Sequence, residues 1–365
     1  MSVDSVLTRS AQGKKEHKTR VCIRGMYGLL GSRIALAIGK SSDMEVSTGI
    51  VKSDPTLRSA LSAFKQLPEG IRKRIVPERM YLDDKHATVR ELNASQDVVR
   101  FEPADQLNVA KECDALIDAA SPGSSQKWME RYTTSNRTVI LQSGEYPHGS
   151  LIVAPVVKDR NAKIHRQGDC VLSGIVPVLA SLAPLAARIT MHILTQYTEK
   201  LNDYTTDQRL GTVYLREEIK EQLETELVPM FPETNLTLLG VTQASGLSFY
   251  TATLLVETRE ALSGQQLKEL LSGKPRIRVV PDIRSTFEIA HYKEIVEAFD
   301  GKVQPITVFG SGLNSNEKTT MHRIMIAIDY RYIAVLPNID AVRMLASGMD
   351  GEQAMKVTDR DMNFA

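Results

Sequence analysis

Short apolar runs separated by helical patterns dominate the first part of the chain. The runs that predict buried strands lie at 21–23, 45–51, 115–120 and 138–141. A helical pattern at 32–38 follows the first of them. Strands that alternate with helices are typical of a parallel sheet with helices on its faces. We therefore predict a doubly wound α/β domain over residues 19–148.

The pattern changes in the second half. A long apolar helix is predicted from Cys170 to about Ala187, with a bend at Pro177 or Pro184. Strand patterns follow at 189–194, 236–241, 248–257, 276–280 and 321–335, and helical patterns lie at 216–227, 260–271, 338–347 and 353–363. Consecutive strands with few crossovers predict a mixed or antiparallel sheet. Residues 149–334 are therefore expected to form an α+β substrate domain.

The turn after the first predicted strand contains Gly25, Gly28 and Gly31 in the pattern G-x-x-G-x-x-G. Glycines between a strand and a helix allow the backbone to approach a pyrophosphate, which then rests on the helix N-terminus. The order strand, turn, helix and strand predicts a Rossmann-type dinucleotide site. The alternative is a glycine turn in an α/β protein that binds no nucleotide.

The residues that follow the other predicted strands indicate which dinucleotide is bound and what lines its crevice. An acid that selects NAD is expected after the second strand, and this chain has Lys52 and Ser53 there. A lysine and a hydroxyl suit a 2′-phosphate, so NADP is expected to be at least tolerated. Lys52 as an ordinary solvated loop residue is equally compatible with the pattern. Ser121-Pro122-Gly123 and Gln142–Glu145 follow two more strands and are expected to line the crevice.

Cys170 begins the long apolar helix of the second half. A helix N-terminus presents unpaired N–H groups and the positive end of the helix dipole. Both favour a thiolate, so Cys170 is our candidate nucleophile. The alternative is a buried structural cysteine, which is the commoner fate of a free cysteine.

Composition narrows the class of protein. The chain has 365 residues, which suits two domains, and 45 Lys+Arg against 44 Asp+Glu, which gives no electrostatic case for a nucleic-acid partner. Three scattered cysteines fit a reducing compartment and predict neither a disulfide framework nor a metal cluster. No apolar run predicts a signal or a membrane span. We expect a cytoplasmic protein whose residues 1–18 are a mobile tail.

With these residues in view, the chain resembles the archaeal-type (type II) glyceraldehyde-3-phosphate dehydrogenases. The likeness extends from residue 20 to the end in the family's order and spacing. The segments that carry it are 27–31, 43–46 with Lys52, 142–145, 170–174, 285–289, 338–343 and 362–363. The resemblance implies an NAD- or NADP-dependent enzyme and a homo-oligomer, a dimer or tetramer. It also implies that residues 335–365 pack back on the nucleotide domain.

Carried over residue by residue, the resemblance makes Cys170 the nucleophile. It places Leu29, Leu30, Gly144 and Asn338 against the dinucleotide. The chain also departs from the family. Val171-Leu172-Ser173 replaces Asn-Thr-Thr after the cysteine, and no histidine occurs at 248–250, where the family has its general base. The family's arginine pair falls near Thr195-Gln196, which weakens the case for a phosphorylated substrate.

His192 is our replacement for the missing base, because its strand carries substrate-facing residues in the family. His165, His291 and His322 are further candidates, and each is also compatible with an ordinary core or surface histidine. The predicted chemistry is addition of the Cys170 thiolate to a carbonyl, hydride transfer to or from a nicotinamide, and resolution of a thioester. A semialdehyde or acyl-phosphate reductase and a non-catalytic nucleotide-binding relative remain as alternatives.

Overall fold

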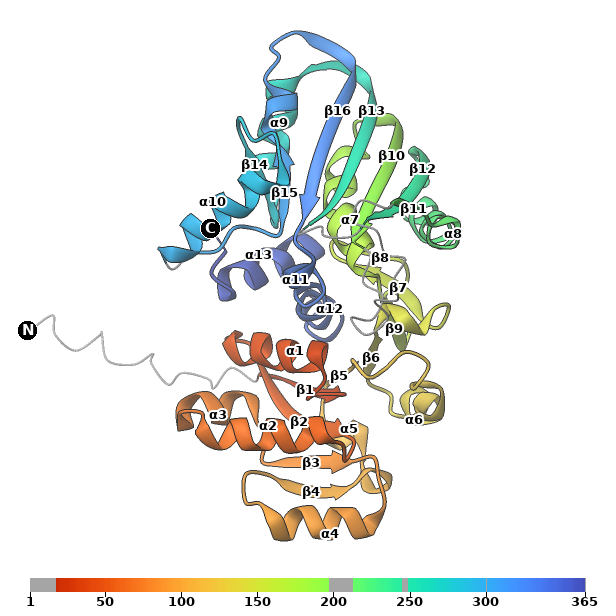
Figure 1. The fold of residues 1–365 in the computed structure, drawn as a ribbon. Coiled ribbons are helices and arrows are strands. Elements are labelled where there is room, and N and C mark those ends of the chain that lie inside the picture. Colours follow the sequence, from red (N-terminus) through yellow and green to blue (C-terminus); the bar gives the residue numbers. More distant parts are fainter. Residues whose placement is uncertain (1–17, 197–212, 245–248, 300, 365) are drawn as a thin grey trace, which may run out of the picture.

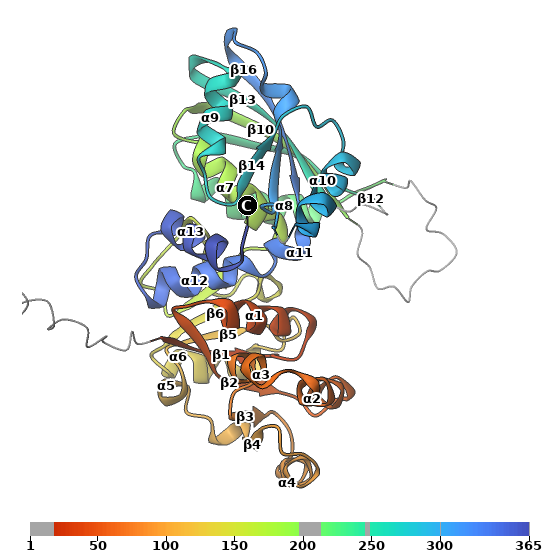
Figure 2. The same ribbon diagram turned by 90° about the vertical axis from the view of Figure 1, so that its left-hand side faces the viewer.

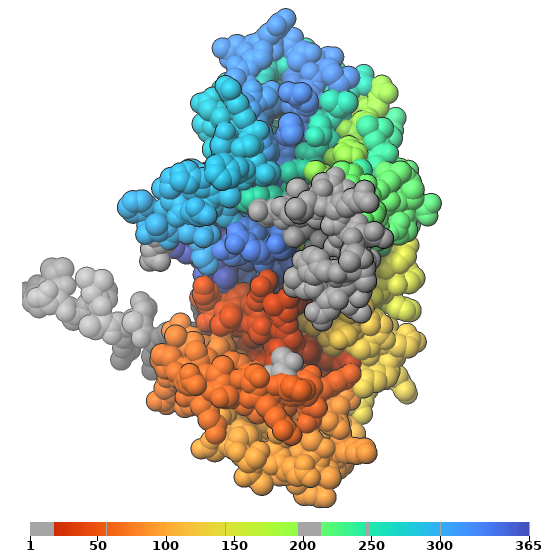
Figure 3. All heavy atoms as spheres, in the orientation of Figure 1, coloured from red at the N-terminus to blue at the C-terminus, as the bar shows by residue number. Residues whose placement is uncertain are grey.

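The computed structural model describes residues 18–196, 213–244, 249–299 and 301–364. The expected tail at 1–18 lies outside these residues except for Lys18. The strands of the described chain form two sheets, one above the other in Figure 1. In the space-filling view, the red-to-yellow segment makes the lower half of the face and the green-to-blue segment the upper half (Figure 3). Among the described residues, no helix combines the length and apolar character needed to cross a membrane.

The first sheet has the strand order β4-β3-β2-β1-β5-β6-β9-β7-β8. Its strands are β1 (Thr19–Arg24), β2 (Met44–Val51), β3 (Arg79–Leu82), β4 (Arg100–Pro103), β5 (Ala115–Asp118), β6 (Thr138–Leu141), β7 (Ser150–Val153), β8 (Val156–Val157) and β9 (Ile164–Gln167). Its helices are α1 (Leu29–Lys40), α2 (Pro55–Gln66), α3 (Glu69–Ile75), α4 (His86–Ser95), α5 (Val109–Glu112) and α6 (Met129–Thr134). The central strand β1 pairs in parallel with β2 and β5. The predicted doubly wound α/β fold is thereby confirmed.

The second sheet has the order β11-β12-β10-β13-β16-β15-β14 and mixes parallel with antiparallel pairs. Its strands are β10 (Ala186–Gln196), β11 (Val213–Leu215), β12 (Asn235–Ala244), β13 (Tyr250–Ser263), β14 (Ile277–Val280), β15 (Ile306–Phe309) and β16 (Lys318–Ile328). Its helices are α7 (Cys170–Leu182), α8 (Glu217–Leu227), α9 (Gly264–Ser272) and α10 (Thr286–Ala298). Alternate residues of β10, among them Met191 and Ile193, face the core that contains α7. The opposite face of this sheet is partly exposed.

The chain then returns to the first half. Helices α11 (Tyr330–Ile333), α12 (Leu336–Ala346) and α13 (Gly351–Asp361) follow β16, and α12 packs against α1, β5 and β6. Their apolar side chains, including Ile339 and Met355, belong to the core of the first sheet. Arg343 of α12 holds this position through hydrogen bonds to Asp43 at 2.7 and 2.9 Å. Figure 2 shows α12 and α13 between the two sheets.

Three local patterns end differently from the sequence-based expectation. Strands β7 to β9 extend the first sheet beyond the expected domain boundary at 148, and we place that boundary after β9. Residues 260–263 continue β13, and the helix begins at Gly264 because Ser263 caps it. The strand expected to reach 335 ends at Ile328, since the Asp329 side chain accepts from the N–H of Arg331 and starts α11.

Candidate functional site

One hollow of about 600 Å³ lies between the two halves. Its floor is formed by residues at the carboxyl ends of β1, β5 and β6, and its far wall includes Asp169, Cys170 and Ala334. In open α/β sheets ligands bind in the crevice at this end of the strands. The lining residues that the sequence predicted are Gly25, Gly28, Leu29, Leu30, Lys52, Ser121, Pro122, Gly144 and Cys170.

The turn at 25–28 presents backbone to the hollow. Gly25 has φ +76°, which favours glycine, and its N–H donates to Ile50 O at 2.8 Å. Gly28 is the N-cap of α1, and no side chain caps this helix. Leu29, the first helical residue, is 75% exposed. The helix therefore presents uncapped N–H groups to the hollow, an arrangement that fits a pyrophosphate.

Gly31 does not line the hollow. A Cβ at Gly31 would lie 2.2 Å from the carbonyl oxygen of Gly25, so its role is to let α1 close tightly on the turn. Gly144 has a comparable packing role in the opposite wall. A Cβ there would lie 2.8 Å from Cγ of Pro122, which means that the two wall loops are in direct contact.

Two buried charges under the turn escaped the sequence analysis. Arg24 and Asp118 end β1 and β5, and Arg24 Nη1 lies 2.8 Å from Asp118 Oδ2. Ser125 Oγ and Tyr132 Oη each donate to the same carboxylate at 2.7 Å. The only signal in the sequence is a charge at the end of each apolar run. The pair fixes the two strand ends that form the floor.

The end of the hollow beyond β2 contains three charged side chains. Lys52 is exposed, Asp54 caps α2 through the N–H of Leu57, and Asp83 accepts from Lys127 at 2.7 Å. Asp54 and Asp83 thus have partners within the protein, and Lys52 is the exposed basic side chain at this end of the hollow. Ser53, the other predicted residue, does not line the hollow.

Asn338 supports the hollow from behind. It is fully buried at the start of α12, and its Oδ1 accepts from Nε2 of Gln142 at 2.6 Å. Gln142 lines the hollow, whereas Asn338 does not. The structure therefore places Asn338 as the residue that orients Gln142.

Cys170 is the first residue of α7, and Asp169 is its N-cap. The Asp169 carboxylate accepts from the N–H of Leu172 at 2.8 Å, and residues 171–179 are all buried. A capped, buried helix fixes the position of its first side chain. Cys170 itself is half-buried and faces the hollow that begins at the glycine turn.

The electrostatics of Cys170 differ from the thiolate that the sequence led us to expect. Burial and, to a smaller extent, the charge of Asp169 raise the pKa of its thiol to about 12. Hydrogen bonds from Tyr250 and from the N–H groups at the start of α7 act in the opposite direction on this pKa. Burial also raises the pKa of Asp169, to about 6. In the free protein Cys170 is therefore a thiol at neutral pH.

The side chain of Tyr250 is hydrogen-bonded to Cys170. The Sγ–H group donates to the Tyr250 hydroxyl oxygen at 3.6 Å. Tyr250 begins β13, in the strand that the family resemblance marked for a missing histidine. Tyr250 was not among the predicted site residues, because the family resemblance pointed to a histidine in this segment.

None of the four histidines proposed as a base contacts Cys170 in the described structure, and His192 is withdrawn from that role. His192 alternates in β10 with buried Met191 and Ile193, so it lies on the sheet face opposite α7, with Nε2 3.4 Å from Thr242 Oγ1. His322 faces the core, but it is six residues along β16 from Ile328, the partner of Tyr250. That separation is roughly 20 Å.

The remaining two histidines are placed elsewhere. His165 is buried in β9 and does not line the hollow, and burial lowers its pKa. His291 is exposed on α10, with Nδ1 4.0 Å from a carboxylate oxygen of Glu294. Within the described residues, no group of three or more His, Cys, Asp or Glu side chains could hold a metal ion.

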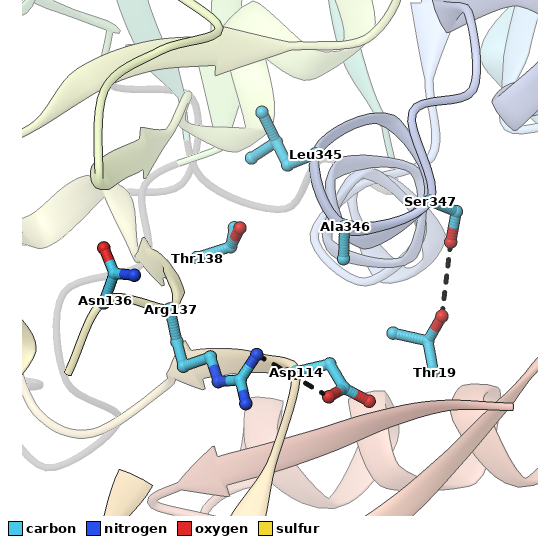
Figure 4. A pocket seen from close by; sticks show the side chains of 8 residues that line it. All are labelled: Thr19, Asp114, Asn136, Arg137, Thr138, Leu345, Ala346 and Ser347. Carbon is cyan, nitrogen blue, oxygen red and sulfur yellow. Dashed lines mark hydrogen bonds and ion pairs between the residues drawn. The ribbon is translucent and has the colours of Figure 1, made fainter. Parts of the chain in front are cut away.

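A second hollow, of about 580 Å³, lies at the opposite ends of the same strands. Thr19 and Thr138 begin β1 and β6, and Asp114 precedes β5 (Figure 4). Its side chains already bond to one another, as in the 3.2 Å contact between the hydroxyls of Thr19 and Ser347. None of the site residues predicted from the sequence lines it.

Comparison with known proteins agrees with the predicted resemblance. No protein-family model matches the chain. It is 22% identical to a glyceraldehyde-3-phosphate dehydrogenase of Sulfolobus acidocaldarius over 95% of this chain and 98% of the relative. It is 23% identical to the enzyme of the same name from Pyrobaculum arsenaticum over 94% and 97%. The resemblance to the archaeal enzymes is confirmed as a distant one.

Solved structures show the same fold. Aspartate semialdehyde dehydrogenase II of Vibrio cholerae, complexed with ASA, superposes with a TM-score of 0.54 at 14% identity and covers 94% of this chain and 99% of its own. Aspartate semialdehyde dehydrogenase with NADP from Candida albicans gives 0.55 at 11% identity over 95% and 99%. The architecture of a parallel α/β half followed by a mixed-sheet half is therefore shared over 94–95% of this chain.

Proposed function

We propose that this chain, a distant relative of the archaeal glyceraldehyde-3-phosphate dehydrogenases, is an NAD(P)-dependent oxidoreductase that acts at the aldehyde level through Cys170. One observation carries the proposal: a single hollow is lined both by the uncapped N-terminus of α1 and by Cys170. The start of α1 would hold the phosphates of a dinucleotide, and the hollow continues from there to Cys170. When bound, the nicotinamide supplies or accepts the hydride.

Each wall of the hollow has a defined task in this proposal. The N–H groups at the start of α1 would hold the pyrophosphate. The Arg24–Asp118 pair and the contact between Pro122 and Gly144 hold the floor and wall in place. Cys170 forms the covalent bond to the substrate carbonyl, which divides one difficult step into two easier ones.

The substrate we propose is a carbonyl compound other than glyceraldehyde 3-phosphate. A phosphate monoester is normally held by arginine, whose planar fork matches its oxygens. Among the described residues that line the hollow, the single arginine is Arg24, and it is buried and paired with Asp118. Of the second candidate, a semialdehyde or acyl-phosphate reductase of biosynthesis, this observation favours the semialdehyde form, because a semialdehyde carries no phosphate. The solved structures of similar fold are aspartate semialdehyde dehydrogenases.

The test compares specificity constants for unphosphorylated aldehydes, amino-acid semialdehydes and glyceraldehyde 3-phosphate, with nicotinamide absorbance as the signal. Cys170→Ala serves as the blank. We expect turnover of at least one unphosphorylated carbonyl. A kcat/KM of about 10⁴ M⁻¹s⁻¹ or more for glyceraldehyde 3-phosphate would contradict the proposed substrate class, because that value is ordinary enzyme efficiency.

The alternative to an enzyme is a non-catalytic nucleotide-binding relative. The high pKa of Cys170 and the lack of a described histidine beside it favour this alternative. The same assay separates the two. Dinucleotide binding with no Cys170-dependent turnover of any carbonyl would establish the non-catalytic protein.

A further inference from the structure

The contact between Cys170 and Tyr250 has the geometry of a catalytic pair. The hydroxyl oxygen of Tyr250 lies 3.6 Å from Sγ, within the range of hydrogen bonds to sulfur. The Tyr250 side chain is 7% exposed, and its ring stacks on Tyr330 with centroids 5.3 Å apart and planes at 24°. A stacked, buried ring at the start of a strand has little freedom to turn away. The hydroxyl is therefore held at the sulfur.

We propose that the Tyr250 hydroxyl takes the place of the missing histidine, as a hydrogen-bond donor that stabilises negative charge first on the Cys170 sulfur and then on the substrate oxygen. This inference rests on the proposed function. It assigns a role to a tyrosine in the segment 248–250, where the sequence lacks the histidine of the family. A donor does not remove a proton from the reacting atoms, so the route it supports is anionic throughout.

The protonation of Tyr250 agrees with a donor role. Burial raises the pKa of its phenol well above the ordinary value, and the negative charge of an ionised Cys170 raises it further. The group is therefore a neutral phenol whenever Cys170 is a thiolate. While Cys170 is a thiol, its S–H donates to the phenol oxygen; once it ionises, the phenol O–H donates to the sulfur.

The other titratable and charged groups near the Cys170 sulfur lie on the helices and strands that pack around it. Asp169 lies beside Cys170 on α7, and its charge raises the pKa of the thiol. Glu226 of α8 and Arg166 of β9 act on Asp169 with opposite signs. Tyr330 of α11 acts on Tyr250. Among these groups, Tyr250 is the one whose side chain stabilises the thiolate by a direct hydrogen bond.

The addition step starts from the thiolate, formed when the Cys170 proton passes to solvent water, and from there it balances without a protein base. A lone pair of the Cys170 thiolate forms the C–S bond, and the π pair of the carbonyl moves to oxygen. The negative charge passes from the sulfur to the new alkoxide oxygen. This oxygen is on the carbon that is now bonded to the sulfur, so the Tyr250 O–H, already at the sulfur, can donate to it. Reversal returns the pair to sulfur. A donor beside a developing alkoxide typically contributes about 10²–10³-fold in rate.

The experiment measures the thiol itself, in the full chain without dinucleotide. Iodoacetamide alkylation of Cys170 is followed at about pH 8 and pH 9, where the rate reports the thiolate fraction. Cys22 and Cys113 are buried, and Cys170→Ala gives their background. Tyr250→Phe keeps the ring and its stack but removes the donor. Tyr330→Phe is the matched control, because it removes the hydroxyl from the other ring of the same stack.

We expect Tyr250→Phe to slow alkylation about tenfold at either pH, equal to a rise of one unit in the pKa of Cys170. Tyr330→Phe should stay within about twofold of the wild type. Glyceraldehyde, added as a reversible carbonyl probe, should protect Cys170 about tenfold less well in Tyr250→Phe, since the alkoxide loses its donor. Thermal melting of both variants establishes that they fold.

Alkylation of a folded Tyr250→Phe protein at the wild-type rate would overturn the inference. It would do so even if aldehydes were turned over, in which case the proposed function stands. Conversely, slowed alkylation and weakened protection without turnover of any carbonyl would support the Tyr250 assignment and remove the proposed function. The two failures are thus distinguishable.

Discussion

The guanidinium of Arg276 donates two hydrogen bonds to the carboxylate of Asp340, of 2.8 and 3.2 Å, and both side chains are fully buried. Arg276 precedes β14 in the second sheet, and Asp340 lies on α12, which packs on the first. Asp359 of α13 accepts from Nε of the same arginine at 3.1 Å. One buried cation therefore fastens both returning helices to the second half.

Removing one charge from this group should destabilise the fold strongly. Asp340→Asn leaves Arg276 buried with an incomplete set of acceptors, and breaking a buried pair in this way typically costs about 3–5 kcal/mol. Lys274→Met is the matched control, because Lys274 and Glu352 join the same regions at 2.7 Å but are 28% and 44% exposed. That change should cost less than about 1 kcal/mol. Urea unfolding measures both, and equal losses would contradict the assignment.

The glycine turn gives a prediction for dinucleotide binding. Gly28 has ordinary extended φ and ψ values, and the nearest atom to an added Cβ is Gly25 O at 3.2 Å. Gly28→Val should therefore fold but abolish binding, since its side chain occupies the space of the pyrophosphate. Gly70→Val, at an open helical position, is the control and should bind normally. Calorimetric titration decides, and unchanged affinity in Gly28→Val would remove the nucleotide site from this turn.

Cofactor preference should depend on Lys52. Its exposed ammonium lies in the hollow beyond β2, while Asp54 and Asp83 have partners of their own. We expect NADP to bind at least as well as NAD, and Lys52→Glu to shift the ratio toward NAD by tenfold or more, about 1.4 kcal/mol. Titration of both cofactors against both proteins tests this. A wild-type preference for NAD of more than about tenfold would contradict it.

Asp169 predicts a pH-dependent stability difference. Its carboxyl has a pKa of about 6 in the fold, against an ordinary 3.8. The folded state therefore binds the proton more tightly than the unfolded state, and the free energy of unfolding falls as pH rises from about 4 to 6. Asparagine also caps helices but has no charge to bury. Asp169→Asn should gain about 1–3 kcal/mol relative to the wild type between pH 4 and pH 7.

Unfolding in urea at both pH values gives that difference directly, because the other titrating groups are common to both proteins. A constant difference would refute the raised pKa. The same variant should alkylate faster at Cys170, since the charge that raises the pKa of the thiol is gone.

The open face of the second sheet predicts self-association. It exposes Leu239, Leu255, Met321 and Met325, which are 62%, 43%, 54% and 37% exposed. Apolar side chains gathered on a sheet face mark a contact surface, and we propose a homodimer or homotetramer. Light scattering should give a mass above that of one chain, and Leu255→Arg should lower it. A particle of 40.5 kDa for the wild type would defeat the proposal.

Sequence periodicity was sufficient for most of the fold because the strongly apolar strands are local patterns. The 138–141 run coincides with β6, and the long helix begins at Cys170 as expected. The helix α10 was not identified, although its capping box, Ser285 with Glu288, is visible in the sequence. That signal was read only as part of a family resemblance.

The site was less predictable because it depends on long-range pairing. Tyr250 reaches Cys170, 80 residues away, only because β13 starts beside the N-terminus of α7. His192 was a reasonable choice from its strand, but the side of a strand on which a residue lies follows from the pleat. Its buried neighbours Met191 and Ile193 are what place it on the far face.

The order of the chain has a consequence for protein synthesis. The first sheet is complete in sequence at Gln167, yet α12, the helix that packs against α1, β5 and β6, begins only at Leu336. A ribosome therefore releases the apolar surface of this sheet well before it makes the segment that buries it. During that interval the faces of α1, β5 and β6 against which α12 packs in the finished protein have no such cover. We therefore expect the first half to reach its final packing only after α12 has been translated.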